Sequence, residues 1–254
     1  MEQTFLRDAI KEISELTRNS SEIAEINNHH YLISNNVYEE ILPDRKPLPA
    51  PLIFTSLDSL VKTIKRERTD ILTATNSGDA LYISIVSPTR VDVFTGLDEH
   101  NRRAKVYTAS QDLDRSWKGQ NWFEHEETMI VLQSQFAQND GTEYLLDFLS
   151  RITDENSVSS DDNGMTQSVQ VKKGIALAGR ENIRPIVSLK PYRTFLEVEQ
   201  PESSFLIRIK DGCKVGIIEA DGGMWQFAAR NSVKEYFEKA FEAEIAEGTV
   251  VVAL

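Results

Sequence analysis

Apolar residues in the first eighteen positions recur at steps of three and four, the spacing of an amphipathic helix. Residues 42–51 then hold four prolines, whose fixed φ and missing amide donors favour an extended connector. Beyond the connector, Thr55 or Ser56 is suited to cap a helix whose apolar stripe runs from Leu57 to Ile64. We therefore expect a first domain over residues 1–50, made of a helix and a proline-rich connector.

The apolar period changes to two from Ala80 onward, which is typical of strands with one buried face. Two strands joined by a turn at residues 87–89, with a third over Arg103–Ala109, predict an antiparallel meander. Helical spacing follows over Glu124–Gln138 and Thr142–Ile152, with Gly141 between the two segments. We expect these two helices to cover the meander and to form with it an α+β half over residues 51–153.

The second half of the chain reads mostly as β-structure. A polar segment, Asp154–Gly164, marks an exposed loop or a boundary before it. Strands are predicted at 166–172, 186–190, 205–210, 215–219 and 225–228, then a helix over 232–246 and a closing strand over 249–254. The fold class is therefore α+β, with antiparallel sheets, flanking helices and a β-rich half over residues 165–254. The closing strand is apolar enough to be central or to pair across a subunit interface, so a homo-oligomer is expected as one possibility.

The 254 residues carry 40 acidic and 28 basic side chains, a formal charge of −12. This charge argues against direct binding of nucleic acid over a broad surface, but leaves open a local basic patch, a basic protein partner or mimicry of nucleic acid. Cys213 is the only cysteine, so neither an intrachain disulfide nor a cysteine zinc site is possible. With no apolar run near 18 residues and no signal-peptide core, we expect no membrane association and a cytoplasmic location.

No motif for phosphate binding or for a nucleophilic serine occurs in the chain. His125 begins a zinc-helix pattern, but Met129 stands where its second histidine is needed. His29 and His30 are adjacent and diverge, and the loop Ser159–Gln170 lacks the first and last acids of a calcium loop. We expect no metal, no cofactor and no enzyme activity.

The segment Glu219–Trp225 is the most conspicuous phrase, because its paired glycines allow positive φ between apolar runs. One interpretation is a hairpin turn with Trp225 in the core. The other is a ligand rim, in which Asp221 accepts hydrogen bonds, Gly222 and Gly223 expose amides and Trp225 offers a stacking surface. Both interpretations remain open from the sequence.

An irregular stretch between two predicted strands carries Arg193, Glu199 and Glu202. It is either a crossover in which Arg193 pairs with a glutamate, or a binding segment held by the β scaffold. On the following strand, alternation points Arg208 and Lys210 outward, where Lys172 or Lys190 would complete a small anion site unless the face is merely solvated.

Several of these phrases carry a resemblance to a protein family. They are FTSLDSL from Phe54, VSPTRV from Val86, PYRTF from Pro191, QPESSF from Gln200 and EADGGMW from Glu219. From about Phe54 onward the chain resembles the YfdQ-like group of tailed-bacteriophage and prophage proteins. The resemblance implies an early phage gene near recombination and replication functions, expressed in the cytoplasm of an infected bacterium, and implies no established activity.

These observations leave three hypotheses of function. The first is a non-enzymatic phage protein that binds a host or phage protein, either inhibiting a host defence factor or assisting phage DNA metabolism. The second is a protein that sequesters a nucleotide-like molecule in a pocket of Arg193, Arg208, Lys210 and Trp225. The third is an enzyme, for which Asp221, Glu219 and Glu199 are the acid/base candidates.

Overall fold

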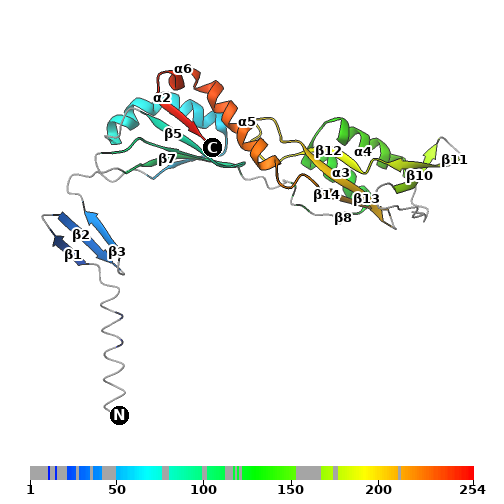
Figure 1. The fold of residues 1–254 in the computed structure, drawn as a ribbon, viewed down its shortest axis with the longest axis horizontal. Helices are drawn as coiled ribbons and strands as arrows, with labels where there is room; N and C mark the ends of the chain where they lie inside the picture. The colour runs from blue at the N-terminus through cyan, green and yellow to red at the C-terminus, as the bar shows by residue number, and fades with distance from the viewer. Residues whose placement is uncertain are drawn as a thin grey trace, which may run out of the picture. The chain divides into compact units, whose positions relative to one another are not determined.

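A computed structural model gives the fold of the chain in two units, Met1–Leu48 and Pro49–Leu254, which are described separately (Figure 1). It describes residues 11, 15, 22–26, 29–34, 37–41, 50–75, 80–98, 102–111, 117, 119, 122–152, 167–173, 177–210 and 213–254. No helix in this part of the chain is both long and apolar enough to cross a membrane.

The first unit contains a three-stranded antiparallel sheet of β1 (Glu22–Ile26), β2 (His29–Ser34) and β3 (Val37–Ile41), in that order. The sequence pattern did not predict these strands. Of the helix predicted over the first eighteen positions, only Lys11 and Glu15 are described, and both are helical. Most of the predicted proline connector, residues 42–49, lies outside the described residues.

One five-stranded sheet of the second unit has the order β15-β5-β6-β7-β4. The predicted meander is confirmed as β5 (Leu81–Ser87), β6 (Arg90–Phe94) and β7 (Lys105–Ser110), which are antiparallel neighbours. Two parallel strands flank it, β4 (Leu52–Phe54) beside β7 and β15 (Val250–Ala253) beside β5.

Helices α2 (Leu57–Thr75), α5 (Trp225–Ala240) and α6 (Glu242–Ala246) accompany this sheet (Figure 1). The predicted stripe of α2 is confirmed, since its apolar members are at most 9% exposed. Val233, Phe237 and Phe241 from the C-terminal helical segment are fully buried in the same core. The expectation that the helices after the meander cover it is wrong, because α2 and α5 supply that apolar layer.

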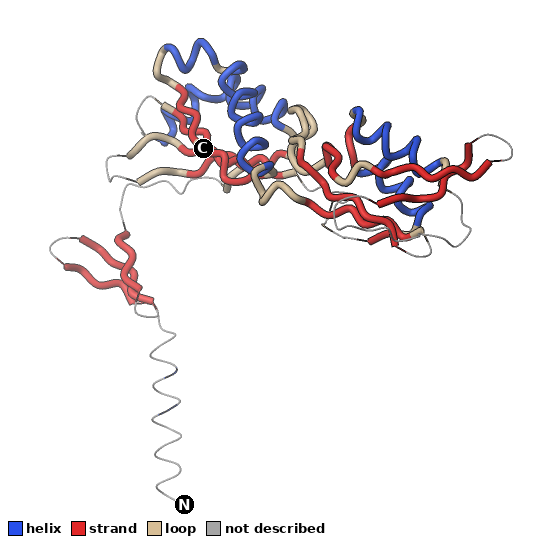
Figure 2. The backbone as a smooth tube through the Cα atoms, turned by 45° about the vertical axis from the view of Figure 1, so that its right-hand side comes forward, coloured by secondary structure: helices blue, strands red, loops and turns tan. Residues whose placement is uncertain are grey.

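A second five-stranded sheet, antiparallel throughout, has the order β8-β14-β13-β12-β9. Its strands are β8 (Trp122–Phe123), β14 (Lys214–Glu219), β13 (Ser203–Lys210), β12 (Ile186–Pro191) and β9 (Phe136–Ala137). Helices α3 (His125–Gln135) and α4 (Asp140–Ser150) lie beside it (Figure 2). They share its core, which includes Phe136, Phe148 and Phe205.

Three local expectations need correction. The strand predicted over 225–228 is wrong, because α5 begins at Trp225. Gly141 lies inside the first turn of α4 and does not separate two helices. β11 (Leu177–Ile183), which forms a hairpin with β10 (Gln167–Lys173), was not predicted as a strand, and the polar segment 154–164 lies outside the described residues.

The α+β class is confirmed, but the two predicted halves do not each form a core of their own. From the C-terminal half, α5 and β15 complete the core of the β5–β7 sheet. From the other half, α3 and α4 fill the core against β12, β13 and β14. Each of the two cores is therefore built from elements of both spans, 51–153 and 165–254.

β15 lies at a sheet edge, because β5 is its one neighbour in the described sheet. The expectation that it could be central is wrong, and pairing across a subunit interface stays a prediction. Its Val251 is 38% exposed, and residues 250–254 carry no charged side chain, proline or glycine that would block edge pairing.

We expect Val251→Lys to abolish self-association of the chain, because a charge on an edge strand opposes pairing with a second copy. Sedimentation velocity over a concentration series measures this. Val86→Lys, at a position 51% exposed on β5, is the control and is expected to leave association unchanged. A wild-type chain that stays monomeric, or an equally dimeric Val251→Lys, contradicts the prediction.

Candidate functional site

The irregular segment 192–202, between β12 and β13, contacts both five-stranded sheets of the second unit. Its Phe195 is fully buried in the core of the β5–β7 sheet, and Thr194 Oγ1 donates a hydrogen bond to the Pro88 carbonyl at 2.6 Å. At its other end the chain enters β13 at Ser203. The segment is therefore anchored on the two sheets at once.

Gln200 holds this segment in shape from within. Its Oε1 accepts hydrogen bonds from the amides of Arg193 at 3.0 Å and Thr194 at 3.3 Å, and its Nε2 donates to the Phe195 carbonyl at 3.0 Å. The side chain is 7% exposed, so these bonds satisfy its buried polar atoms. The backbone that presents Arg193 is consequently fixed.

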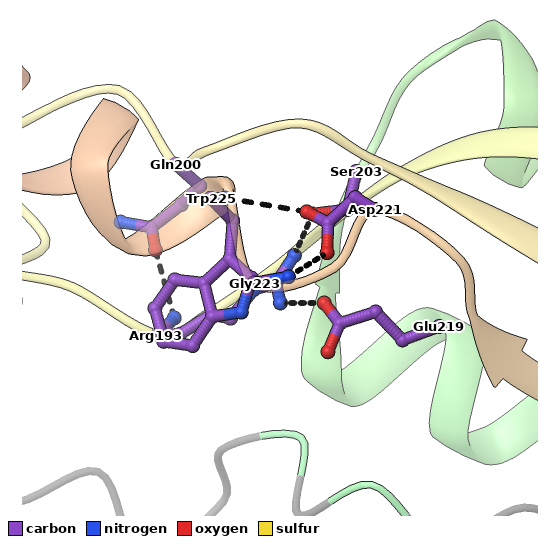
Figure 3. Close-up of polar contacts among 7 residues, drawn as sticks. All are labelled: Arg193, Gln200, Ser203, Glu219, Asp221, Gly223 and Trp225. Carbon is purple, nitrogen blue, oxygen red and sulfur yellow. Dashed lines mark hydrogen bonds and ion pairs between the residues drawn. The ribbon is translucent and has the colours of Figure 1, made fainter.

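Arg193 is 5% exposed and lies at the centre of the candidate site (Figure 3). One terminal nitrogen of its guanidinium donates to Glu219 Oε1 and the other to Ser203 Oγ. The guanidinium carbon lies 4.2 Å from the centre of the Trp225 ring, a cation–π contact. Burial lowers the pKa of Arg193, and the ion pair with Glu219 counteracts that effect only in part. The predicted crossover, with Arg193 paired to a glutamate, is what the structure contains.

Asp221 joins the same network from the turn between β14 and α5. Its Oδ2 accepts from Ser203 Oγ at 2.6 Å and from the Trp225 amide at 3.3 Å, and its Oδ1 accepts from the Gly223 amide at 2.9 Å (Figure 3). Gly222 and Gly223 have φ of +64° and +84°, which a side chain would disfavour. The segment Glu219–Trp225 is thus a turn between a strand and a helix, and the interpretation as a hairpin turn is wrong.

Burial alone would raise the pKa of the Asp221 carboxyl, but its hydrogen bonds from Ser203, Gly223 and Trp225, with the charge of Arg193, lower it below the usual value. A lowered folded-state pKa means that the unfolded chain binds the proton more readily. The ionised Asp221 carboxylate therefore stabilises the fold fully at pH values above the pKa of about 3.9 in the unfolded chain. This stabilisation is lost as the pH falls through the lower pKa of the folded state.

We expect Asp221→Asn to be less stable than the wild type near neutral pH, with the difference narrowing as the pH falls from about 5 towards 2. Urea unfolding followed by circular dichroism at several pH values measures it. Ser203→Ala removes one of the hydrogen bonds to the carboxylate and should show a weaker pH dependence than the wild type. If the stability difference between Asp221→Asn and the wild type does not change with pH, the ionised carboxylate of Asp221 is not what stabilises the fold.

A hollow of about 290 Å³ lies beside this network, and we name it the α5 hollow. Its lining residues are Ser188, Glu202, Ser203, Ser204, Asp221, Met224, Trp225, Phe227 and Ala228. Met224 and Phe227, from the start of α5, are 68% and 51% exposed. The hollow therefore has one apolar wall from α5 and one polar wall from strands β12 and β13 and the loop before β13.

The structure brings together most of the predicted site residues. Arg193, Asp221, Gly223 and Trp225 are in contact, Gly222 lies in their turn, and Glu202 lines the α5 hollow with Asp221. Glu199 is turned to another neighbour, since its carboxylate forms an ion pair with Lys190 at 2.6 Å.

Arg208 and Lys210 point outward on β13 as predicted, but they lie away from the site. Arg208 is five residues beyond Ser203 on the same strand, roughly 17 Å along it. Lys210 Nζ lies 3.7 Å from the centre of the Trp122 ring. The proposed nucleotide pocket of Arg193, Arg208, Lys210 and Trp225 is therefore not assembled. The anion site with Lys190 is not assembled either, since Lys190 binds Glu199, and the side chain of Lys172 is not described.

Sequence reasoning missed Ser203, Gln200, Met224 and Phe227. Ser203 was within reach, because extending the inward series of Phe205 and Ile207 back by two residues places a hydroxyl inside, where it needs a partner. Met224 and Phe227 are three apart, which gives a shared face only if the segment is helical.

The acid/base candidates are all engaged in contacts within the chain. Asp221 accepts three hydrogen bonds, Glu219 binds Arg193, and Glu199 binds Lys190. His125 Nε2 lies 2.8 Å from the Leu149 carbonyl oxygen. Over the described ranges, no group of three His, Cys, Asp or Glu side chains is arranged to hold a metal ion.

Comparison of the chain with protein-family models, curated proteins and solved structures finds no match, so the resemblance to the YfdQ-like group stays a prediction.

Proposed function

We propose that the chain is a non-enzymatic phage early protein that acts in the infected bacterial cytoplasm by binding a protein partner through the α5 hollow. The partner is a host or phage protein, and the effect is inhibition of a host defence factor or support of phage DNA metabolism. The formal charge of −12 favours a protein over nucleic acid as that partner.

The observation that carries the proposal is the exposure of Met224 and Phe227 at the mouth of a hollow whose base is fixed by hydrogen bonds. Large apolar side chains at a pocket rim are common centres of protein interfaces. Burying one such side chain contributes about 1.5–3 kcal/mol. Covering both would supply part of the free energy that association requires, and contacts of the partner with the polar wall of the hollow would supply the rest.

The engagement of the three acid/base candidates supports binding over catalysis. A general acid or base has to reach a substrate proton with an appropriate pKa. The pKa of Asp221 and that of Glu199 are both lowered, the former against its burial and the latter by Lys190, which makes each a weaker base. Glu219 is held by Arg193.

The test is a photo-crosslinking amino acid at position 227, introduced into the full chain in phage-infected cells. We expect one or a few defined protein adducts, identified by mass spectrometry, that disappear when Met224→Asp is added. The matched control places the same crosslinker at Ile130, which is 60% exposed on α3 and does not line the hollow. Equal adducts at both positions, or none at position 227, would count against the proposal.

A further inference from the structure

We infer that the α5 hollow takes a short segment of the partner in which one large apolar side chain lies next to a lysine or arginine. This inference rests on the proposed function and names the chemistry of its partner. It is carried by three features of the hollow: its size, the position of the carboxylate of Glu202, which has no ion-pair partner among the described residues, and the fixation of its tryptophan wall.

The hollow is small for a binding site and has room for a large side chain of a partner. Its volume of about 290 Å³ lies at the lower limit of the roughly 300–1,000 Å³ found for small-molecule sites. Met224, which is the N-cap residue of α5, and Trp225, Phe227 and Ala228 from its first turn supply the apolar wall. An aliphatic or aromatic side chain entering here would cover the exposed parts of Met224 and Phe227, and that burial is the main source of affinity.

The charge of the hollow selects what flanks that side chain. Two carboxylates line it, and Asp221 is already hydrogen-bonded on both oxygens and lies in the field of Arg193. Glu202 is different, because its carboxylate accepts a hydrogen bond from the neutral hydroxyl of Ser188. Among the described cations, Lys190 acts on it only through the longer-range attraction of its charge, because Lys190 is ion-paired with Glu199. A lysine or arginine of the partner would form a charge-assisted hydrogen bond with Glu202, whereas an acidic residue would be repelled.

The tryptophan wall is set before any partner arrives. One face of Trp225 meets the Arg193 guanidinium at 4.2 Å, and its amide is bound by Asp221. A surface that needs no rearrangement loses little free energy to ordering on binding. Short segments with few contacts are therefore able to bind measurably.

The experiment is a selection of random dodecapeptides displayed on messenger RNA against the full-length chain. We expect the enriched peptides to share a Leu, Ile, Met, Phe or Trp within a few positions of a Lys or Arg. A fluorescent peptide from that set should bind about tenfold more weakly to Phe227→Ser and to Met224→Ser. Ile130→Ser, at an apolar position outside the hollow whose exposure lies between those of Phe227 and Met224, is expected to leave binding unchanged.

The role of Glu202 is tested by a double-mutant cycle. Glu202→Gln should weaken the selected peptide severalfold, and the same peptide with its cation replaced by glutamine should bind Glu202→Gln and wild type alike. Thermal unfolding of each variant shows that the chain remains folded.

Enrichment of acidic or wholly polar peptides, absence of enrichment, or binding that ignores both Phe227→Ser and Glu202→Gln would overturn the inference. If adducts at position 227 still form in infected cells, the proposed function survives that result, and only the assigned chemistry of the partner fails. If those adducts are also missing, both fail.

Discussion

Replacing Arg193 with methionine is expected to lower the free energy of unfolding by about 3 kcal/mol. The guanidinium is 5% exposed and binds Glu219, Ser203 and the face of Trp225. Removing one member of a buried ion pair typically costs about 3–5 kcal/mol, because the other charge loses its partner. The side chain of Glu219 is 31% exposed and regains some hydration, which places the cost at the lower end of that range.

Urea unfolding measures this change as a lower midpoint, by about 1 M if the slope is about 3 kcal/mol/M. Arg193→Lys keeps the charge but loses the planar fork, so we expect an intermediate loss. Lys62→Ala is the control, because its ion pair with Asp58 is exposed to solvent and is expected to contribute little to the free energy of unfolding. If Arg193→Met unfolds at the same midpoint as Lys62→Ala, the network does not stabilise the fold.

The second large effect is expected for Gly141→Ala, which should destabilise the chain by about 3 kcal/mol. A Cβ atom at this position would lie 1.9 Å from the Ser188 carbonyl oxygen and 2.9 Å from Val187 Cγ1, both on β12. Because the nearest atom belongs to the backbone of β12, which is paired on both sides, α4 itself would have to move. Helix propensity alone predicts the opposite sign, since alanine is favoured over glycine in a helix by about 1 kcal/mol.

Thermal and urea unfolding of Gly141→Ala, compared with Gly222→Ala, separate steric from conformational effects. Gly222 has a φ of +64° and no atom within 4 Å of an added Cβ, so its substitution should cost only about 1–2 kcal/mol. A Gly141→Ala variant as stable as the wild type would show that α4 does not pack on β12 as closely as described.

The sequence predicts those parts of the fold in which the apolar residues recur at the period of a helix or strand and are also the residues that become buried. Leu81, Ile83 and Ile85 alternate and are at most 1% exposed, and the stripe of α2 recurs at helical steps. The start of α5 breaks this agreement, because Met224 and Phe227 are apolar and exposed while the run Trp225–Ala228 is too short to show a period. A pair of glycines before it then favours a hairpin over the strand-to-helix turn that Asp221 stabilises.

Several residues of the site were predictable from the sequence, but the contacts that they make were not. Arg193, Glu202, Asp221 and Trp225 were all singled out, and Arg193 was expected to pair with a glutamate. Which glutamate it binds depends on the register of β13 with β14, where Phe205 lies opposite Glu219. The same register places Arg208 opposite Gly216, away from Ser203, and no local pattern encodes such long-range pairing.

The late position of β15 in the chain affects how the protein is made. Strands β5 to β7 leave the ribosome long before α5 and β15, which cover their apolar face and extend their edge. Until α5 has been synthesised, Leu81, Ile83 and Val93 are covered by α2 alone and lack the part of the apolar layer that α5 supplies. A nascent chain in this state exposes apolar surface and is prone to associate with other apolar surfaces until α5 and β15 have been added.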